Sequence, residues 1–231
     1  MLRTVLCLLA LFVSANCSGQ ELAKETKKDA MTAAQLQEWA KEKKLESITL
    51  GAGCFWCTEA SFQQINGVEK VVSGYSNGHV ENPTYEQICT KKTGHVEVAQ
   101  IFFDPKVVKL EQILAVFFAI HDSTSMDRQG ADAGPQYRSA IFFHNDEQKA
   151  IAEKCMAIAG EALAPQKVVT VLDPLKSFYV AEDYHQNYYK NNPKNGYCVA
   201  VVREKVLKVR KAFGDLLNAE AKAAAAGEQP K

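Results

Sequence analysis

Runs of β-favouring residues alternate with segments of helical spacing through the middle of the chain, and this alternation limits the folds open to it. The β-favouring runs lie at residues 47–50, 68–75, 95–103, 137–143 and 168–172. Between the third and fourth runs, apolar residues recur at the spacing of one buried helix face: Leu110, Ile113, Leu114, Phe117 and Phe118. This mixture predicts an α+β class, a two-layer α/β sandwich with a ferredoxin-like mixed sheet.

The segments on either side of this region differ from it in composition. Residues 17–46 are rich in Lys, Glu, Ala and Gln, and we expect a charged tether there. Part of that segment is expected to be a helix packed on the domain, because Ala33, Leu36 and Ala40 recur at helical spacing. Residues 219–231 are expected to form a low-complexity tail, the fraying end of a helix.

The first residues have the pattern of an export signal. Arg3 precedes an apolar run from Val5 to Val13, which is too short to cross a bilayer because a spanning helix needs about 20 apolar residues. Residues 1–16 therefore predict a signal peptide and an exported protein of the bacterial cell envelope. Two outcomes stay open. Cleavage after Ala15 would free a soluble protein, whereas Cys17 resembles the lipid-modified first residue of a mature lipoprotein.

Charge and cysteine content exclude several classes of protein. Lys plus Arg and Asp plus Glu each number 27, so nothing favours binding to nucleic acid. Seven cysteines occur, and with Cys7 and Cys17 set aside an odd number remains, which argues against a fully paired disulfide framework. Because there is no second Cys-x-x-Cys and no His pair at ligand spacing, we expect no metal site. At least one thiol should be free for chemistry.

Cys54 follows the first predicted strand and a glycine-rich turn, and it lies at the start of a predicted helix. A cysteine attacks as its thiolate, and the N–H groups and partial positive charge of a helix N-terminus would stabilise that form. Phe55 and Trp56 beside it could wall an apolar pocket. The local sequence predicts a nucleophile. It leaves open a structural pair or a thioredoxin-type redox couple with Cys57.

The run Gly53-Cys54-Phe55-Trp56 resembles the active-site motif of type A peptide methionine sulfoxide reductases. Further segments resemble parts of that family in the same order, at residues 82–85, 93–98, 129–132, 136–140 and 181–186. The resemblance covers about residues 48–198 and implies a catalytic domain at 47–218. It also implies an α+β sandwich, no metal or organic cofactor, and reduction of methionine-S-sulfoxide, free or in proteins.

The resemblance implies that Cys54 attacks the sulfoxide sulfur and that Glu97 protonates the oxygen. A carboxyl can do so only if its pKa is raised, which a partly apolar site would achieve. Val96 and Val98 flank Glu97 in a predicted strand, where a lone carboxylate would be costly to bury. His185 lies in a matching segment, and we expect a structural role for it.

Other residues of the predicted site also come from the resemblance. Tyr85 and Tyr137 would donate hydrogen bonds to the sulfoxide oxygen, as the donors of an oxyanion hole do. Asp132 would help to hold the substrate network. Phe55 and Trp56 would bind the methyl group of the substrate.

The sulfenic acid left on the nucleophile must condense with another thiol. Cys198 occupies the place of a recycling cysteine in many family members, and we favour it. However, the glycine-rich continuation usual there is replaced by residues 199–202, which we expect to form a strand that could bury Cys198. Cys57 is the alternative, because it could close a small loop. Cys89 and Cys155 have no motif and are expected to be buried.

A disulfide formed in this way needs an external reductant. Thioredoxin is the family's reductant, and outside the cytoplasm a thioredoxin-like protein would replace it. We expect a monomer. Two other hypotheses remain, a thiol–disulfide oxidoreductase using Cys54 and Cys57, and a non-catalytic envelope lipoprotein. Disulfide exchange alone would have no use for the carboxyl of Glu97.

Overall fold

The computed structural model describes residues 31–227 of the chain. The predicted signal peptide at 1–16, the predicted anchor Cys17 and the start of the predicted tether lie outside the described residues. Between residues 31 and 227, no helix is both long enough and apolar enough to cross a membrane. The domain boundaries stay predictions.

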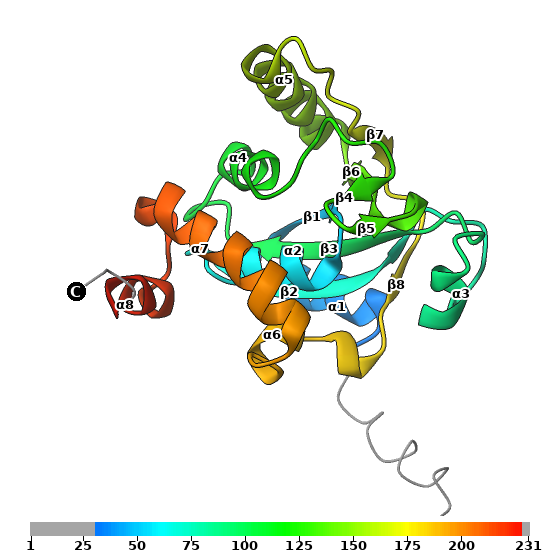
Figure 1. The fold of residues 1–231 in the computed structure, drawn as a ribbon, viewed down its shortest axis with the longest axis horizontal. Coiled ribbons are helices and arrows are strands. Elements are labelled where there is room, and N and C mark those ends of the chain that lie inside the picture. The colour runs from blue at the N-terminus through cyan, green and yellow to red at the C-terminus, as the bar shows by residue number, and fades with distance from the viewer. Residues whose placement is uncertain (1–30, 228–231) are drawn as a thin grey trace, which may run out of the picture. The chain divides into compact units, whose positions relative to one another are not determined.

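A six-stranded sheet forms the centre of the described part (Figure 1). Its order is β7-β6-β1-β3-β2-β8, in which β6 and β7 run parallel and the other neighbours antiparallel. The strands are β1 (Glu46–Ala52), β2 (Val68–Ser76), β3 (Val96–Phe103), β6 (Ser139–Phe143), β7 (Val171–Pro174) and β8 (Phe178–Val180). A separate hairpin pairs β4 (Arg128–Gln129) with β5 (Asp132–Ala133).

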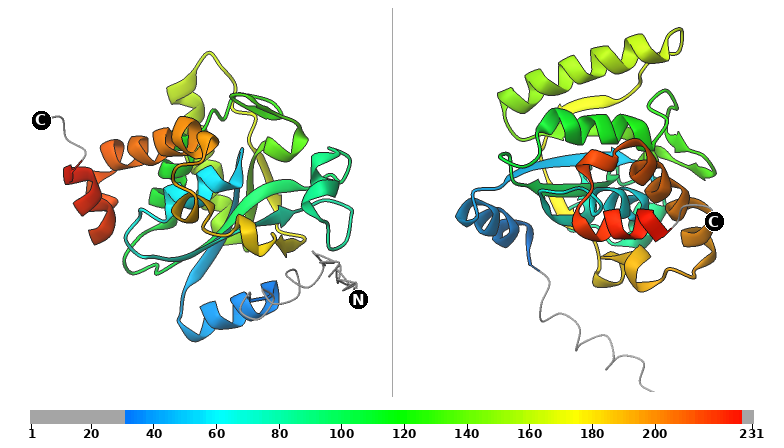
Figure 2. Two further views of the ribbon diagram at one scale, coloured as in Figure 1. Left: turned by 60° about the horizontal axis from the view of Figure 1, so that its bottom comes forward. Right: turned by 90° about the vertical axis from the view of Figure 1, so that its left-hand side faces the viewer.

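Helices lie on both sides of this sheet. They are α1 (Ala33–Glu42), α2 (Phe55–Phe62), α3 (Tyr85–Cys89), α4 (Leu110–Ile120), α5 (Asp146–Leu163), α6 (Tyr188–Asn191), α7 (Arg203–Ala212) and α8 (Ala219–Gly227). Shorter helical turns are η1 (Pro135–Tyr137), η2 (Asp183–His185), η3 (Cys198–Val202) and η4 (Gly214–Leu216). Helix α1 covers one face of the sheet, and α2 and α7 lie over the other (Figure 2).

Alternation along the strands separates the two cores. Ile101 and Phe103 of β3 join the large cluster under α4 and α7, whereas Phe102 between them packs with Leu36 of α1. The same alternation places Glu97 on the face of Ile101, which is the face covered by α2.

The α+β class predicted from the sequence is confirmed. The central elements follow the order β1-α2-β2-β3-α4-β6, and their strands lie in the order β6-β1-β3-β2. This is the split β-α-β arrangement of ferredoxin-like folds. It places the N-terminus of α2 directly after the central strand β1, where the candidate nucleophile lies.

The strand predicted at residues 199–202 is wrong. These residues form the π-helical turn η3, which continues into α7. Val202, Val206 and Val209 are buried at helical spacing, so packing of that face outweighs the β propensity of the valines. Cys198 at the start of the turn is fully buried, as expected.

Side chains fix the start of α5. Asn145 caps the helix by accepting from the Gln148 amide, and the Gln148 side chain accepts from the amide of His144 and donates to the carbonyl of Ser47. The segment expected to be a tail begins with α8, in which Ala221 is buried.

Candidate active site

Cys54 is the N-cap residue of α2, which places its thiol at the end of the helix that carries the free N–H groups. The turn before it needs glycine. Gly53 has a φ of 86°, and a Cβ there would lie 2.6 Å from Cγ of Gln129. The β4–β5 hairpin therefore packs directly against the turn that presents the nucleophile.

Glu97 lies beside this helix end and is buried, at 2% exposure. It stands opposite Tyr75 in the β2–β3 pairing, and its Oε2 accepts from the backbone N–H of Phe55 at 3.3 Å. Burial raises the pKa of the Glu97 carboxyl well above its usual range, and the nearby Cys54 adds to the effect. Burial therefore favours the protonated form of Glu97, which can donate a proton.

The helix N-terminus stabilises a Cys54 thiolate, but burial has the larger effect in the resting site. Burial raises the pKa of the Cys54 thiol well above its usual range, and the hydrogen bond with Cys57 adds to this. The amide of Trp56 lowers the pKa by a smaller amount, while the amide of Phe55 is already bonded to Glu97. Desolvation therefore outweighs the helix dipole, and Cys54 rests as a thiol.

Cys57 is the direct neighbour of the nucleophile. The two thiols are hydrogen-bonded, and this bond lowers the pKa of Cys57. Residues three apart on a helix have Cβ atoms about 5–6 Å apart, so the pair needs only small adjustments to reach disulfide geometry. Cys54 is 7% exposed and Cys57 is fully buried, so Cys54 is the thiol that substrate can reach.

Tyr85 and Tyr137 reach the same site from different elements. Thr84 and Gln87 form a capping box that starts α3 at Tyr85, and Tyr137 ends the turn η1. Burial raises the pKa of both phenols. For Tyr85 the neighbouring Cys89, to which it is hydrogen-bonded, is the next cause. For Tyr137 the next cause is the nearby Glu97. The two hydroxyls therefore stay protonated and can act as donors near Cys54.

Asp132 is linked to the candidate site by Tyr197, which the sequence analysis did not identify as a site residue. The Tyr197 hydroxyl donates to Oδ2 of Asp132 at 2.5 Å, and it is also hydrogen-bonded to the thiols of Cys54 and Cys57. Its position directly before Cys198 was the available signal. Through its bond to Asp132, Tyr197 connects the segment before η3 to the β4–β5 hairpin, next to the two thiols.

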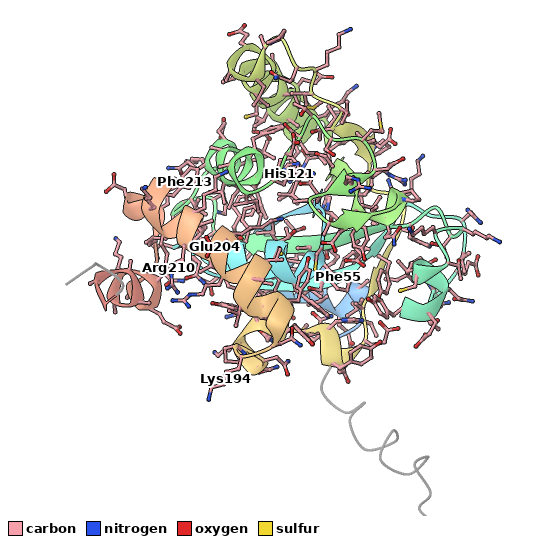
Figure 3. The ribbon with its side chains drawn as sticks, viewed as in Figure 1. Phe55, His121, Lys194, Glu204, Arg210 and Phe213 are labelled. Atoms are coloured by element: carbon pink, nitrogen blue, oxygen red, sulfur yellow. The ribbon has the colours of Figure 1, made fainter. Side chains whose placement is uncertain are left out.

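The two aromatic residues after Cys54 differ in their surroundings. Phe55 is 1% exposed and packs against Tyr75 and His185, with ring centroids 5.8 and 4.9 Å away, and Figure 3 shows it within the interior. Trp56 is half-buried. Its Nε1 donates to Nδ1 of His185 at 3.1 Å. Trp56 is therefore the more accessible wall for a substrate group.

Glu182 accepts hydrogen bonds from two tyrosines near Phe55 and Trp56, and the sequence did not indicate this role. Its carboxylate accepts from the Tyr75 hydroxyl at 2.9 Å and from the Tyr85 amide at 2.8 Å. Burial lowers the pKa of His185 to about 4, so its ring is neutral and can accept from Trp56. These contacts fit the structural role expected of His185.

A family model described as peptide methionine sulfoxide reductase matches residues 46–217. The chain belongs to this family. Peptide methionine sulfoxide reductase MsrA 1 of Rhodopirellula baltica is 53% identical over 177 residues, which cover 77% of this chain and 92% of that protein. The MsrA of Deinococcus radiodurans is 50% identical over 75% of this chain and 84% of its own length.

Solved structures agree with this assignment. The reduced form of Mxr1 from Saccharomyces cerevisiae has a TM-score of 0.62 and 35% identity, covering 67% of this chain and 89% of Mxr1. Methionine sulfoxide reductase A of Corynebacterium diphtheriae has a TM-score of 0.62 and 34% identity, covering 64% and 76%. The chain is therefore a thiol-dependent oxidoreductase, a peptide-methionine (S)-S-oxide reductase.

The other cysteines of the reductase have different environments. Cys198 is fully buried in the same cluster as Cys54 and Cys57, and burial raises its pKa. Cys155 is half-buried. Cys89, expected to be buried, is exposed because it ends the short surface helix α3. All five cysteines within residues 31–227 are free thiols.

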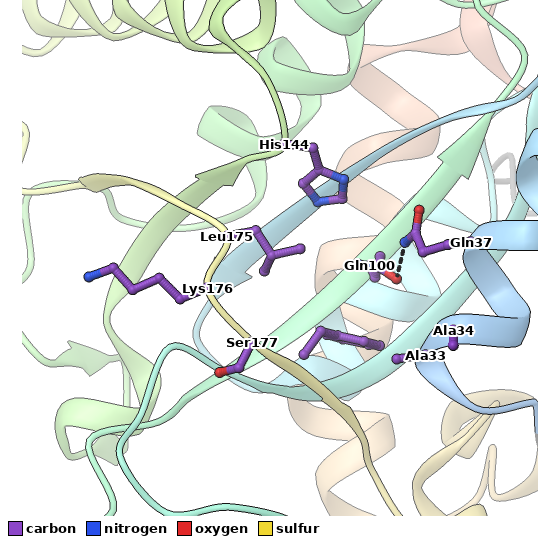
Figure 4. A pocket seen from close by; sticks show the side chains of 9 residues that line it. Ala33, Ala34, Gln37, Gln100, His144, Leu175, Lys176 and Ser177 are labelled. Atoms are coloured by element: carbon purple, nitrogen blue, oxygen red, sulfur yellow. Dashed lines mark hydrogen bonds between the residues drawn. The ribbon is translucent and has the colours of Figure 1, made fainter.

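A pocket of about 370 Å³ lies beside α1 and the β7–β8 connection, apart from the candidate site (Figure 4). In it Nε2 of Gln37 donates to Oε1 of Gln100 at 3.2 Å. None of the predicted site residues lines this pocket. Within the described part of the reductase, no group of three His, Cys, Asp or Glu side chains is arranged to hold a metal ion.

Proposed function

We propose that Cys54 reduces methionine-S-sulfoxide with Glu97 as the proton donor and with Tyr85 and Tyr137 as hydrogen-bond donors to the oxygen. The observation that carries this proposal is the bond from the Phe55 amide to Glu97, because it holds the carboxyl beside the nucleophile's helix end, while burial raises the pKa of that carboxyl. Burial favours the neutral forms of the acid and of the two phenols, and groups of this kind can polarise an S–O bond.

The first step transfers oxygen from one sulfur to another. Cys54 attacks the sulfoxide sulfur and forms a bond between the two sulfurs, while Glu97 protonates the oxygen and the phenols donate hydrogen bonds to it. The oxygen then moves as a hydroxyl to the Cys54 sulfur, the S–O bond and the bond between the two sulfurs break, and the thiol proton replaces the one that Glu97 gave. The product on Cys54 is a sulfenic acid. Cys54 is oxidised by two electrons and the substrate sulfur is reduced by two, which gives methionine. Trp56 forms the wall for the methyl group, with Phe55 supporting it from behind.

Cys57 then resolves the sulfenic acid. Its sulfur attacks that of Cys54, water leaves, and a disulfide remains. We prefer Cys57 to Cys198 because it is hydrogen-bonded to Cys54 and its pKa is lowered, whereas burial raises the pKa of Cys198. An external dithiol, thioredoxin or a thioredoxin-like protein, restores both thiols and leaves as a disulfide. No metal or organic cofactor takes part in these steps.

Replacement of Cys54 by serine tests the proposed chemistry. Cys54→Ser should keep the circular dichroism spectrum of the wild type and lose turnover of the S epimer, because an alcohol cannot form the sulfenic acid. The R epimer should be left unreduced by both proteins. Turnover of the S epimer by folded Cys54→Ser, or preference for the R epimer, would refute the assignment.

We also propose that the reductase is exported, with residues 1–16 as its signal peptide and Cys17 as the site of a lipid anchor. We propose further that the mature protein is a monomer. Supporting export, the family match begins at residue 46 and leaves the preceding segment outside the catalytic domain. Intact-mass measurement of the protein from a bacterial membrane fraction tests it. A lipid mass on Cys17 that disappears in Cys17→Ser is expected. An unprocessed Met1 would contradict export, and light scattering checks the monomer.

A further inference from the structure

Helix α2 carries a second buried acid that the chemistry above does not use. Glu59 is 1% exposed, and it lies three residues after Trp56, on the same side of the helix. A buried carboxyl is costly unless hydrogen bonds compensate for the water it has lost. The partners that compensate Glu59 therefore indicate what it holds in place.

Those partners are backbone groups of the segment that enters α6. The amide of Asn187 donates to Oε1 of Glu59 at 2.9 Å, and the amide of Tyr188 also bonds to this carboxyl. Asn187 has a left-handed conformation, with φ 54° and ψ 33°. Its side-chain Oδ1 accepts from Nε2 of Gln63 at 2.9 Å, so the C-cap residue of α2 holds the same turn.

The turn held in this way places an aromatic ring against Trp56, the residue proposed to contact the substrate methyl group. The ring of Tyr188 stacks on Trp56 with centroids 3.7 Å apart and an interplanar angle of 6°. Trp56 is thus held by Tyr188 on its face and by His185 at its Nε1. Since Trp56 and Glu59 belong to one helix, the Glu59 contacts and the stacking together set how α6 meets α2.

We propose that Glu59 is a positioning residue for substrate binding: it holds the backbone of Asn187 and Tyr188 so that Tyr188 stacks on Trp56 and fixes the wall that receives the substrate methyl group. The inference rests on the proposed function, in which Trp56 lines the substrate site. It assigns Glu59 no contact with substrate and no part in proton transfer.

The test compares Glu59→Ala, Glu59→Gln and Tyr188→Leu in a Trp39→Phe background, where Trp56 is the remaining tryptophan. Glu59→Ala should raise KM for a methionine-S-sulfoxide peptide about tenfold with little change in kcat, the pattern of lost binding. It should also change Trp56 fluorescence and near-UV circular dichroism. Glu59→Gln retains an acceptor oxygen for the Asn187 amide and should restore most of the wild-type KM and spectrum.

Ser61→Ala is the matched control. Ser61 is buried on the same helix, and its hydroxyl has no hydrogen-bond partner among residues 31–227, so its loss should leave KM within about twofold of wild type. Tyr188→Leu removes the ring but keeps the backbone bond, and it should show the same rise in KM as Glu59→Ala.

Two outcomes would overturn the inference. One is a folded Glu59→Ala with wild-type KM and Trp56 spectrum, or with a loss confined to kcat. If Glu59→Ala does not fold, a wild-type KM in Tyr188→Leu would overturn it equally. These results differ from failure of the proposed function, which would appear as turnover by Cys54→Ser in the same assay.

Discussion

The backbone amide of Phe55 donates to Oε2 of Glu97 at 3.3 Å, so the first free N–H of the nucleophile's helix serves the acid and not the thiol. Cys54 and Glu97 are both buried, and burial raises the pKa of each. Burial therefore favours the neutral forms of both groups in the resting site. A sulfoxide that enters meets a proton donor and a nucleophile that loses its proton only during the reaction.

Glu97→Gln should lower the single-turnover rate of methionine release about 100-fold, because the amide cannot protonate the oxygen. The pKa of Glu97 is raised, so the wild-type rate should fall as the pH rises through that value and the donor is lost. The variant should lack this fall. Rapid-quench rates of both proteins, measured from acidic to alkaline pH, check it. Exposed Glu69→Gln is the control, and a wild-type rate in Glu97→Gln would contradict the assigned role.

Tyr197→Phe should slow disulfide formation more than methionine release. The hydroxyl contacts both thiols and lowers the pKa of Cys57, so its loss should raise the pKa of the attacking thiol. We expect resolution of the sulfenic acid to slow about tenfold, the effect of one lost hydrogen bond to a charged group. Trapping the sulfenic acid with dimedone measures this. Equal slowing of methionine release and disulfide formation would contradict this role, because it would mean that the whole site is disturbed. Tyr189→Phe is the control and should slow neither step.

Glu59 should make the stability of the reductase depend on pH. Burial raises its pKa from 4.5 to about 7, so the unfolded chain loses this proton at lower pH than the folded one. Stability from this group is therefore full below pH 4.5 and declines as the pH rises to about 7, by about 3 kcal/mol in all. Urea unfolding of wild type and Glu59→Gln at low and high pH measures it. A difference between the two proteins that does not change with pH would disprove it.

Sequence patterns predicted the parts of this protein that depend on local spacing. The stripe beginning at Leu110 gave α4, and the glycine turn correctly placed Cys54 at a helix start. Glu97 could be placed in a buried strand because apolar residues flank it. The β propensity of residues 199–202 led to the wrong prediction of a strand, because the buried face of α7 extends back to Val202.

Features that depend on contacts between distant segments could not be read from one sequence. The burial that protonates Cys54 arises from several elements packing together, and the helix-end motif gives no measure of it. Tyr197 and Glu182 lie far along the chain from the helix that they serve, and Glu59 looked like an ordinary helix residue. Only its partners at Asn187 and Tyr188 reveal a function for it.

In the proposed reaction Cys54 takes the oxygen and Cys57 resolves the sulfenic acid. Reaction of the reduced protein with one equivalent of methionine-S-sulfoxide, followed by alkylation and peptide mapping, tests it most directly. We expect a Cys54–Cys57 disulfide in the wild type and in Cys198→Ser, and a persistent sulfenic acid on Cys54 in Cys57→Ser. A Cys54–Cys198 disulfide in the wild type, or methionine release with Cys54 unmodified, would contradict it.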